Sequence, residues 1–456
     1  QETRVAGRAD GGVDERGPAR PRVRRHSARQ ALEPLGAHLT RASPFETSHR
    51  PGLYLQDDTF GFGFDTTLGS GAPPQGEWGM SALTVACASR LLRSAAGLRS
   101  PIEHARANPV ARALGLSPSD GEAAFSSTSG HEGEGDGSSE CARKRPGDDG
   151  LPIVYHPAYS KPVMPEGHRF PMPVFREIYR RLLRDGVAVP GKNLFQPARM
   201  PSLEELTAVH DEEYVNKFMM GAMSDDDLRR MGLPWTEDLV ERTLSEVSGT
   251  MLCADLALTC GLAVNTAGGT HHAHRSHASG YCIFNDLAVT AKRVIARGAV
   301  ERVLIVDLDV HQGDGTASTT AADPGIYTLS VHCEDNFPAK KSTSSRDVAL
   351  PTGTEDDVYI KTTEAALRES IEEHGPQLVL YDAGVDVHGA DDLGGFNLTD
   401  EGLIRREALV LDTCVGRGIP VAAVVGGGYD KDLEALARRH CILHHVAREI
   451  FESNKL

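Results

Sequence analysis

The chain has 456 residues with 48 basic and 64 acidic side chains, a formal net charge of −16 at pH 7. Nearly all of this acidic excess lies in residues 151–456. An acidic surface repels phosphate and attracts basic ligands such as lysine-containing peptides, so we expect no direct binding of nucleic acid. No segment approaches 18 uncharged apolar residues, which predicts no membrane span. The eight cysteines form no CxxC pair, and we expect reduced, mostly buried thiols.

Residues 1–116 are predicted to be a mostly disordered N-terminal extension, because they are rich in Gly, Ser, Pro and Arg and have few sustained apolar faces. The segment from Met80, which begins "MSALTVACASRLLRSAAGLRS", has the composition of an organellar transit peptide. This predicts a plastid or a mitochondrion, and the alternative is an ordinary extension on a protein of the cytoplasm or nucleus. Residues 117–150 are predicted to be a low-complexity polar linker.

Residues 151–456 show regular apolar periods and are predicted to form one folded domain. Helical spacing occurs over residues 173–184, 203–220, 237–259, 282–297, 355–373 and 399–417. Between the helices lie four strand-like runs, "RVLIVDLD", "GIYTLSVH", "QLVLYDAG" and "IPVAAVVGGG". Continuous apolar strands separated by helices predict a three-layer α/β/α fold with a mainly parallel sheet.

Polar residues with catalytic chemistry gather where these strands end. The strand "VLIVD" leads into Asp307, Asp309, His311 and Asp314, and "LVLYDAGVD" leads into Asp386. The last strand ends in three glycines and Tyr429, while "NTAGGTHHAH" supplies His271 and His272. A parallel sheet directs all its carboxyl ends to one edge, so these four clusters should meet there.

The residue types predict a hydrolytic metal site. Two carboxylates and one imidazole, from Asp309, His311 and Asp386, suit Zn²⁺ with a coordination position left open. His271 and His272 are candidate acid/base groups, and Asp307 and Asp314 are carboxylates that can each fix one imidazole. Tyr429 follows a glycine triplet and can donate a hydrogen bond to an oxyanion. Each feature alone also occurs as a helix cap, a satisfied polar group or a turn, so the shared edge carries the prediction.

The stretches "GGTHHAHRSHASGYCIFND", "VDLDVHQGDGT", "DAGVDVHGADDLGGFNLT" and "VVGGGYD" resemble the zinc-dependent histone deacetylase family, which has the arginase/deacetylase fold. The resemblance runs from about Val154 to Phe451. Gln312 stands where many members carry a second histidine, and with "GHRFPMP" and "LGGFNLT" it makes the chain most similar to class IV deacetylases and their bacterial and plant relatives.

This resemblance implies one Zn²⁺ per chain on the three ligands above, with the two histidines as a charge-relay-like pair. It further implies a narrow channel for the lysine stem lined by Gly280, Tyr281 and Phe337, and an arginine below the metal at Arg169. A K⁺ ion near Asp307, His311 and Ser330 is also a feature of the family.

The expected reaction is hydrolysis of acyl-lysine amides in proteins or peptides, including histone tails, with a histidine, His272, deprotonating the attacking water. Two alternatives stay open. An acetylpolyamine or other small-molecule amidohydrolase would use the same ligands, and a binuclear manganese ureohydrolase would need further carboxylate ligands. A catalytically inactive binding module is disfavoured by the presence of every candidate catalytic group.

Overall fold

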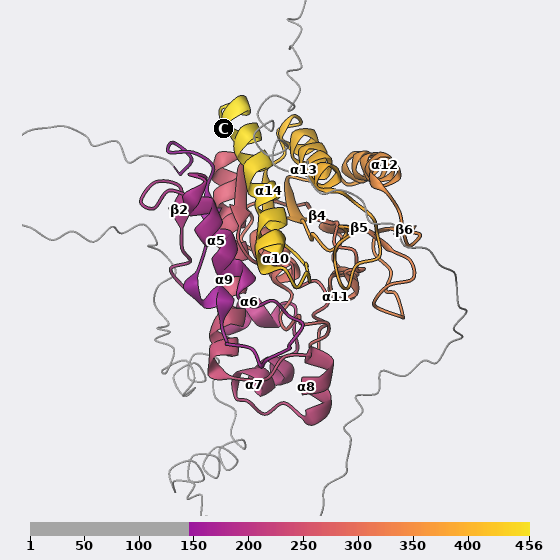
Figure 1. Cartoon of the computed structure of the whole chain (residues 1–456). Coiled ribbons are helices and arrows are strands. Elements are labelled where there is room, and N and C mark those ends of the chain that lie inside the picture. Colours follow the sequence, from indigo (N-terminus) through magenta and orange to yellow (C-terminus); the bar gives the residue numbers. More distant parts are fainter. Residues whose placement is uncertain (1–145) are drawn as a thin grey trace, which may run out of the picture. The chain divides into compact units, whose positions relative to one another are not determined.

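A computed structural model describes residues 146–456 of the chain (Figure 1). The predicted extension, its transit peptide and nearly all of the predicted linker lie outside these residues, so those predictions and the cellular location stay predictions. Among the described residues, no helix is long and apolar enough to cross a membrane. The six cysteines of this part of the chain are all free and buried, which agrees with the expectation of reduced thiols.

The core of the described residues is one sheet of eight parallel strands in the order β2-β1-β3-β8-β7-β4-β5-β6. The strands are β1 (Ile153–Val154), β2 (Leu194–Phe195), β3 (Leu262–Asn265), β4 (Val303–Asp307), β5 (Ile326–Cys333), β6 (Arg346–Leu350), β7 (Leu378–Asp382) and β8 (Val421–Val424). Because every strand runs in the same direction, the carboxyl ends of β3, β8, β7 and β4 lie side by side.

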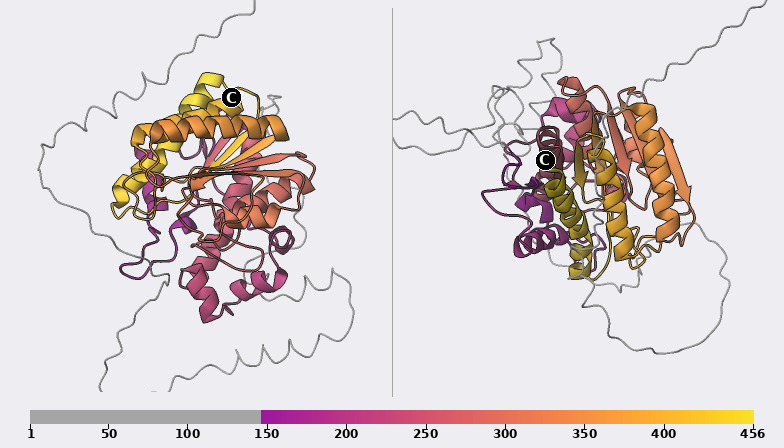
Figure 2. Two further views of the ribbon diagram at one scale, coloured as in Figure 1. Left: turned by 90° about the vertical axis from the view of Figure 1, so that its right-hand side faces the viewer. Right: turned by 90° about the horizontal axis from the view of Figure 1, so that it is seen from above.

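Helices cover both faces of the sheet (Figure 2), so the predicted three-layer α/β/α fold is confirmed. The described helices are a short 3₁₀ helix, η2 (Pro157–Ser160), and the α-helices α5 (Val174–Arg184), α6 (Leu203–Thr207), α7 (Glu212–Met219), α8 (Asp225–Met231), α9 (Glu237–Cys260), α10 (Asp286–Ala296), α11 (Asp314–Thr320), α12 (Asp356–His374), α13 (Asp400–Val415) and α14 (Leu433–Asn454).

Alternate residues of each central strand point to opposite faces, as the pleat of a strand requires. In β4, Val303 and Ile305 join an apolar cluster with α9 and α10. Leu304 and Val306 join a larger cluster that includes residues of α12, α13 and α14. Burial on both faces explains why the strands read as uninterrupted apolar runs.

The helix predicted over 203–220 is wrong as one element, because the chain forms α6 and α7 with a break between them. The break lies at His210 and Asp211. The buried His210 ring binds two backbone groups, the carbonyl of His274 at 2.9 Å and the amide of Asn285 at 2.9 Å. Asp211 is extended and donates its own N–H to the Arg275 carbonyl at 2.8 Å, so the helical ladder stops there.

Candidate active site and metal site

Three side chains from two adjacent strand ends converge as a candidate metal-ligand set. Asp309 and His311 follow β4, and Asp386 follows β7, which pairs with β4. Their ligand atoms all lie within 4.8 Å of one another. His311 Nδ1 lies 2.9 Å from Asp309 Oδ1 and 3.1 Å from Asp386 Oδ2, and all three residues are buried. One imidazole nitrogen and two carboxylate oxygens at these separations fit a tetrahedral zinc site with a position left for water.

Backbone groups hold both carboxylates of this set in place. The Gly427 N–H donates to Asp309 Oδ2 at 2.9 Å, and the Val310 N–H donates to Asp386 Oδ1 at 2.9 Å. A Cβ at Gly427 would lie 2.5 Å from the carboxylate oxygens of both Asp309 and Asp386. The glycine run after β8 therefore allows the backbone to approach both ligands closely.

The two adjacent histidines are each tied to a different carboxylate. His271 Nδ1–H donates to Asp307 Oδ2 at 2.9 Å, and His272 Nδ1–H donates to Asp314 Oδ1 at 2.7 Å. All four side chains are buried. Each bond fixes the ring and leaves Nε2 available, and His271 Nε2 lies 3.8 Å from Oδ1 of the candidate metal ligand Asp309.

The surroundings separate the proton affinities of the two imidazoles. Burial lowers the pKa of His272 to about 3, with a further contribution from the neighbouring His271. Burial also opposes charge on His271, but the carboxylates of Asp307, Asp309 and Asp382 outweigh it and raise the pKa of His271 well above its usual value. These surroundings favour a neutral His272 beside a protonated His271.

The loop that carries both histidines is fastened by Asp286 at the start of α10. This buried carboxylate accepts hydrogen bonds from the N–H groups of Gly269 and Thr270, at 3.1 and 2.8 Å. The Thr270 hydroxyl donates to the same carboxylate at 2.7 Å. These bonds set where the chain emerges toward the metal ligands, so they fix the position of His271 and His272.

Tyr429 lies at the end of the glycine run, and its loop is anchored by Asp391. The Tyr429 N–H donates to Asp391 Oδ2 at 2.6 Å, and the Leu393 N–H donates to Asp391 Oδ1 at 2.9 Å. Burial, followed by the charges of Asp309 and Asp386, raises the pKa of the Tyr429 phenol well above its usual value. The phenol therefore keeps its proton and can act as a hydrogen-bond donor.

The residues predicted to line a channel lie around these groups. Phe337 is 42% exposed and meets the His272 ring edge-on, with 4.8 Å between ring centroids. Tyr281 has a positive φ of 67° and lies with its ring centroid 5.9 Å from that of Tyr429. A Cβ at Gly280 would lie 2.7 Å from His272 and 3.2 Å from Phe337. The three residues thus surround the histidine and the tyrosine.

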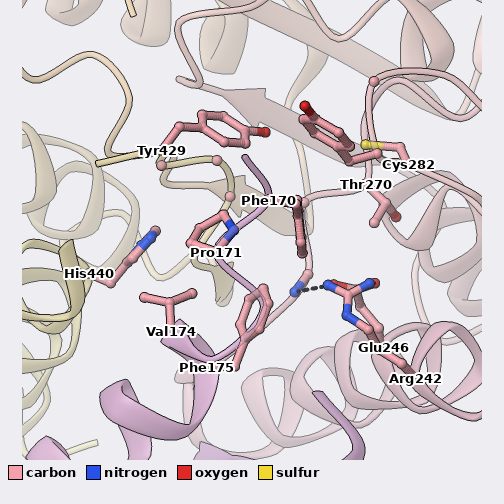
Figure 3. A pocket seen from close by; sticks show the side chains of 17 residues that line it. Phe170, Pro171, Val174, Phe175, Arg242, Glu246, Thr270, Cys282, Tyr429 and His440 are labelled. Atoms are coloured by element: carbon pink, nitrogen blue, oxygen red, sulfur yellow. Dashed lines mark hydrogen bonds and ion pairs between the residues drawn. The ribbon is translucent and has the colours of Figure 1, made fainter. Parts of the chain in front are cut away.

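A small, partly open cavity of about 40 Å³ lies beside the site, and its lining corrects the prediction for Arg169. Arg169 is exposed and does not line this cavity. The arginine that lines it is Arg242 of α9, buried and paired with Glu246 at 2.9 and 3.0 Å. Figure 3 shows this ion pair and Tyr429 on opposite sides of the pocket. The arginine comes from a helix and not from the "GHRF" loop.

Two of these groups were not assigned from the sequence. Asp382 ends β7 with its carboxylate 4.0 Å from His271 Nδ1, and its oxygens have no hydrogen-bond partner among the described residues. Its place at the end of the apolar run "QLVLYD" was a usable signal, because the carboxyl ends of parallel strands meet at one edge. Asp391 had no such signal, because an acid in "GADDLGG" looks like any turn residue.

Comparison with known proteins agrees with this geometry. Residues 168–445 match the histone deacetylase domain model. An uncharacterized protein of Picosynechococcus sp. is 49% identical over 302 residues, covering 66% of this chain and all of the relative. Histone deacetylase 2 of Arabidopsis thaliana is 27% identical over 290 residues, covering 61% of this chain and 74% of that protein. Acetoin utilization protein AcuC of Bacillus subtilis is 29% identical over 304 residues, covering 61% and 77%. The chain therefore belongs to the histone deacetylase family, as its sequence motifs predicted.

Proposed function

We propose that this protein is a zinc-dependent lysine deacylase, which hydrolyses the amide of an acyl-lysine side chain to a carboxylic acid and a free amine. One observation carries the proposal. A buried Asp-His-Asp ligand set, two histidine–carboxylate pairs of opposite proton affinity and a protonated tyrosine meet at one edge of the sheet. Membership of the family supports amide hydrolysis over the binuclear ureohydrolase reaction.

Asp309, His311 and Asp386 would hold one Zn²⁺ per chain. When bound, zinc supplies Lewis-acid polarisation of the acyl carbonyl and lowers the pKa of a water molecule. Burial raises the pKa of Asp309, but the charges of His271 and His311 outweigh it and keep that pKa well below the usual range. The ligand carboxylate is thus ionised before any metal arrives.

His272 removes the proton of the attacking water at Nε2. Its Nδ1–H is committed to Asp314, so the basic lone pair is on the other ring nitrogen. Because burial lowers its pKa, the ring is unprotonated and its lone pair is open to the proton of the water. The same bond to Asp314 stabilises the imidazolium that forms as the proton arrives.

His271 supplies a positive charge and a proton at Nε2 to the leaving amine. Three carboxylates keep its ring protonated, and its hydrogen bond to Asp307 fixes the ring plane. The Tyr429 phenol donates to the oxygen that becomes negative when water adds to the amide carbon. Base, acid and oxyanion donor are thus three different residues.

The substrate class is argued from the channel and from charge. Phe337 beside His272 and Tyr281 beside Tyr429 are aromatic walls, suited to the apolar stem of a lysine. The acidic chain favours a basic protein or peptide such as a histone tail.

The proposal also includes a bound K⁺ ion beside Asp307, His311 and Ser330. It is supported by the pairing of Asp307 in β4 with Ser330 in β5.

A turnover screen tests the proposal with the purified full chain. Acetyl-lysine peptides, long-chain acyl-lysine peptides and acetylpolyamines are each incubated with zinc-loaded protein, and the released acid is quantified. We expect acyl-lysine peptides to be the better substrates. Faster hydrolysis of acetylpolyamines would show instead that the protein is a small-molecule amidohydrolase that uses the same catalytic groups. The acidic surface also fits that basic substrate.

A further inference from the structure

Arg406 of α13 lies fully buried directly behind the metal ligands. All five N–H groups of its guanidinium make hydrogen bonds. Nη1 donates to the carbonyls of Leu308 and Gly384, at 3.2 and 2.6 Å, and Nη2 donates to the Ala383 carbonyl at 3.0 Å. The remaining two donate to Glu407 Oε1, at 3.2 Å from Nε and 2.6 Å from Nη2. This side chain has no free donor left.

The three carbonyls belong to the two segments that carry the metal ligands. Leu308 directly precedes Asp309, while Ala383 and Gly384 lead into Asp386. The ladder between β4 and β7 ends with the pair Asp307 and Asp382, so regular strand pairing stops before the ligands begin. Beyond this point one guanidinium bridges both segments, and it fixes the distance between the two backbones that present the ligand carboxylates.

Two buried tyrosines bind partners of the guanidinium. The Tyr381 hydroxyl of β7 donates to Glu407 Oε2 at 2.5 Å, and the Tyr359 hydroxyl of α12 donates to the Leu308 carbonyl at 3.4 Å. Arg406, Glu407 and both tyrosines are at most 1% exposed. Because the Arg406–Glu407 pair is neutral overall, its effect on the ligands comes from geometry more than from added charge.

We propose that Arg406 is a positioning residue for the metal centre, which locks the Asp309 and Asp386 segments at the spacing that binds zinc. This inference rests on the proposed zinc site and adds a group outside the ligands, the histidines and the tyrosine. The planar fork of a guanidinium can bridge carbonyls of two segments, whereas a lysine ammonium is a point charge without fixed directions. Loss of outer-shell partners typically weakens metal binding by about 10- to 100-fold.

The test is a zinc-affinity measurement on the full chain, in which metal-free protein competes with a chromogenic chelator for zinc. Arg406→Lys keeps the charge and loses the fork, and we expect zinc to bind about 10- to 100-fold more weakly. The triple variant Arg406→Met, Glu407→Met and Tyr381→Phe removes the ion pair and the Tyr381 hydroxyl without leaving a charge unpaired. It also leaves the carbonyls of Ala383 and Gly384 without their donor, so we expect a lower thermal unfolding midpoint without metal together with weaker zinc binding.

Arg293→Met is the matched control. Arg293 of α10 is largely buried and pairs with Asp255 at 2.9 Å, away from the metal ligands. We expect this change to lower the unfolding midpoint and to leave zinc affinity at the wild-type value. If the role of Arg406 were purely structural, the Arg406 variants would likewise unfold at a lower midpoint and bind zinc as tightly as the wild type.

The outcomes separate this inference from the proposed function. Wild-type protein that binds no zinc would overturn the proposed zinc enzyme itself. Wild-type zinc affinity in Arg406→Lys and in the triple variant would overturn only the positioning role. Tyr381→Phe keeps Arg406 and deletes one hydroxyl, so it tests the same network if the larger changes prevent folding: weaker zinc binding supports the role, and unchanged binding contradicts it.

Discussion

Replacing Tyr429 by Phe deletes one hydroxyl from the predicted oxyanion donor and leaves the rest of the site in place. The loop stays anchored, because Asp391 binds the backbone N–H of residue 429 and not its side chain. The phenol is also absent from the metal-ligand set, whose carboxylates are held by the N–H groups of Gly427 and Val310. The variant should therefore bind zinc and substrate as the wild type does.

The expected loss appears in the chemical step. Removing one oxyanion donor typically lowers turnover by about 100- to 1,000-fold, roughly 3–4 kcal/mol of transition-state stabilisation, and here kcat should fall while KM stays nearly constant. Steady-state kinetics on the best acyl-lysine peptide, with zinc content measured in the same sample, gives the answer. Tyr327→Phe is a control for deleting a phenol, since its hydroxyl bonds Glu373 away from the site. A fully zinc-loaded Tyr429→Phe protein with near-normal kcat would remove the tyrosine from the mechanism.

Three further predictions concern the metal, the tyrosine loop and pH. Asp386→Ala leaves two of the three ligands, so the purified protein should lose its single divalent ion in elemental analysis, and full retention would contradict the assigned ligand set. Asp391→Ala removes the anchor of the Tyr429 loop and should lower kcat without removing zinc, whereas Asp391→Asn, which keeps one acceptor oxygen, should restore part of the rate; equal rates in the two variants would argue against the anchor. Burial lowers the pKa of His440 and His444 to about 3, so both stay neutral in the folded protein while the unfolded chain takes up protons below about pH 6.5. The free energy of unfolding should decrease as the pH is lowered from about 6 to 4, by about 1.4 kcal/mol per pH unit for each histidine. Urea unfolding at several pH values gives this dependence on pH, and in His444→Leu it should be smaller by the contribution of one proton. The same pH dependence in wild type and variant would show that this histidine does not contribute.

The sequence was most informative where the chain alternates between apolar strands and polar strand ends. Asp307, Asp309 and Asp386 follow apolar runs, so the rule that parallel strands end at one edge was enough to bring them together. The same rule pointed to Tyr429 after β8. Periodicity could not show the break at His210, because it depends on a side chain that binds backbone groups from a distant segment.

Buried charges on helices were the main part of the site that sequence reasoning missed. Arg242 and Glu246 are four residues apart on α9 and look like an ordinary surface ion pair, yet they are buried and line the cavity beside the site. Arg406 and Glu407 look equally ordinary on α13. The prediction for Arg169 was wrong because it transferred a family role by position in a loop, and the burial of a single arginine depends on packing that a local pattern does not record.

The most direct test of the account is a combined measurement of metal content and acyl-lysine hydrolysis on one preparation of the full chain. We expect one zinc ion per chain and hydrolysis of an acyl-lysine peptide to a carboxylic acid and a peptide that carries a free lysine amine. Chelation should abolish this activity, and added zinc should restore it. Zinc-loaded, folded protein that hydrolyses no acyl-lysine peptide, or activity that survives complete removal of the metal, would contradict the proposed function.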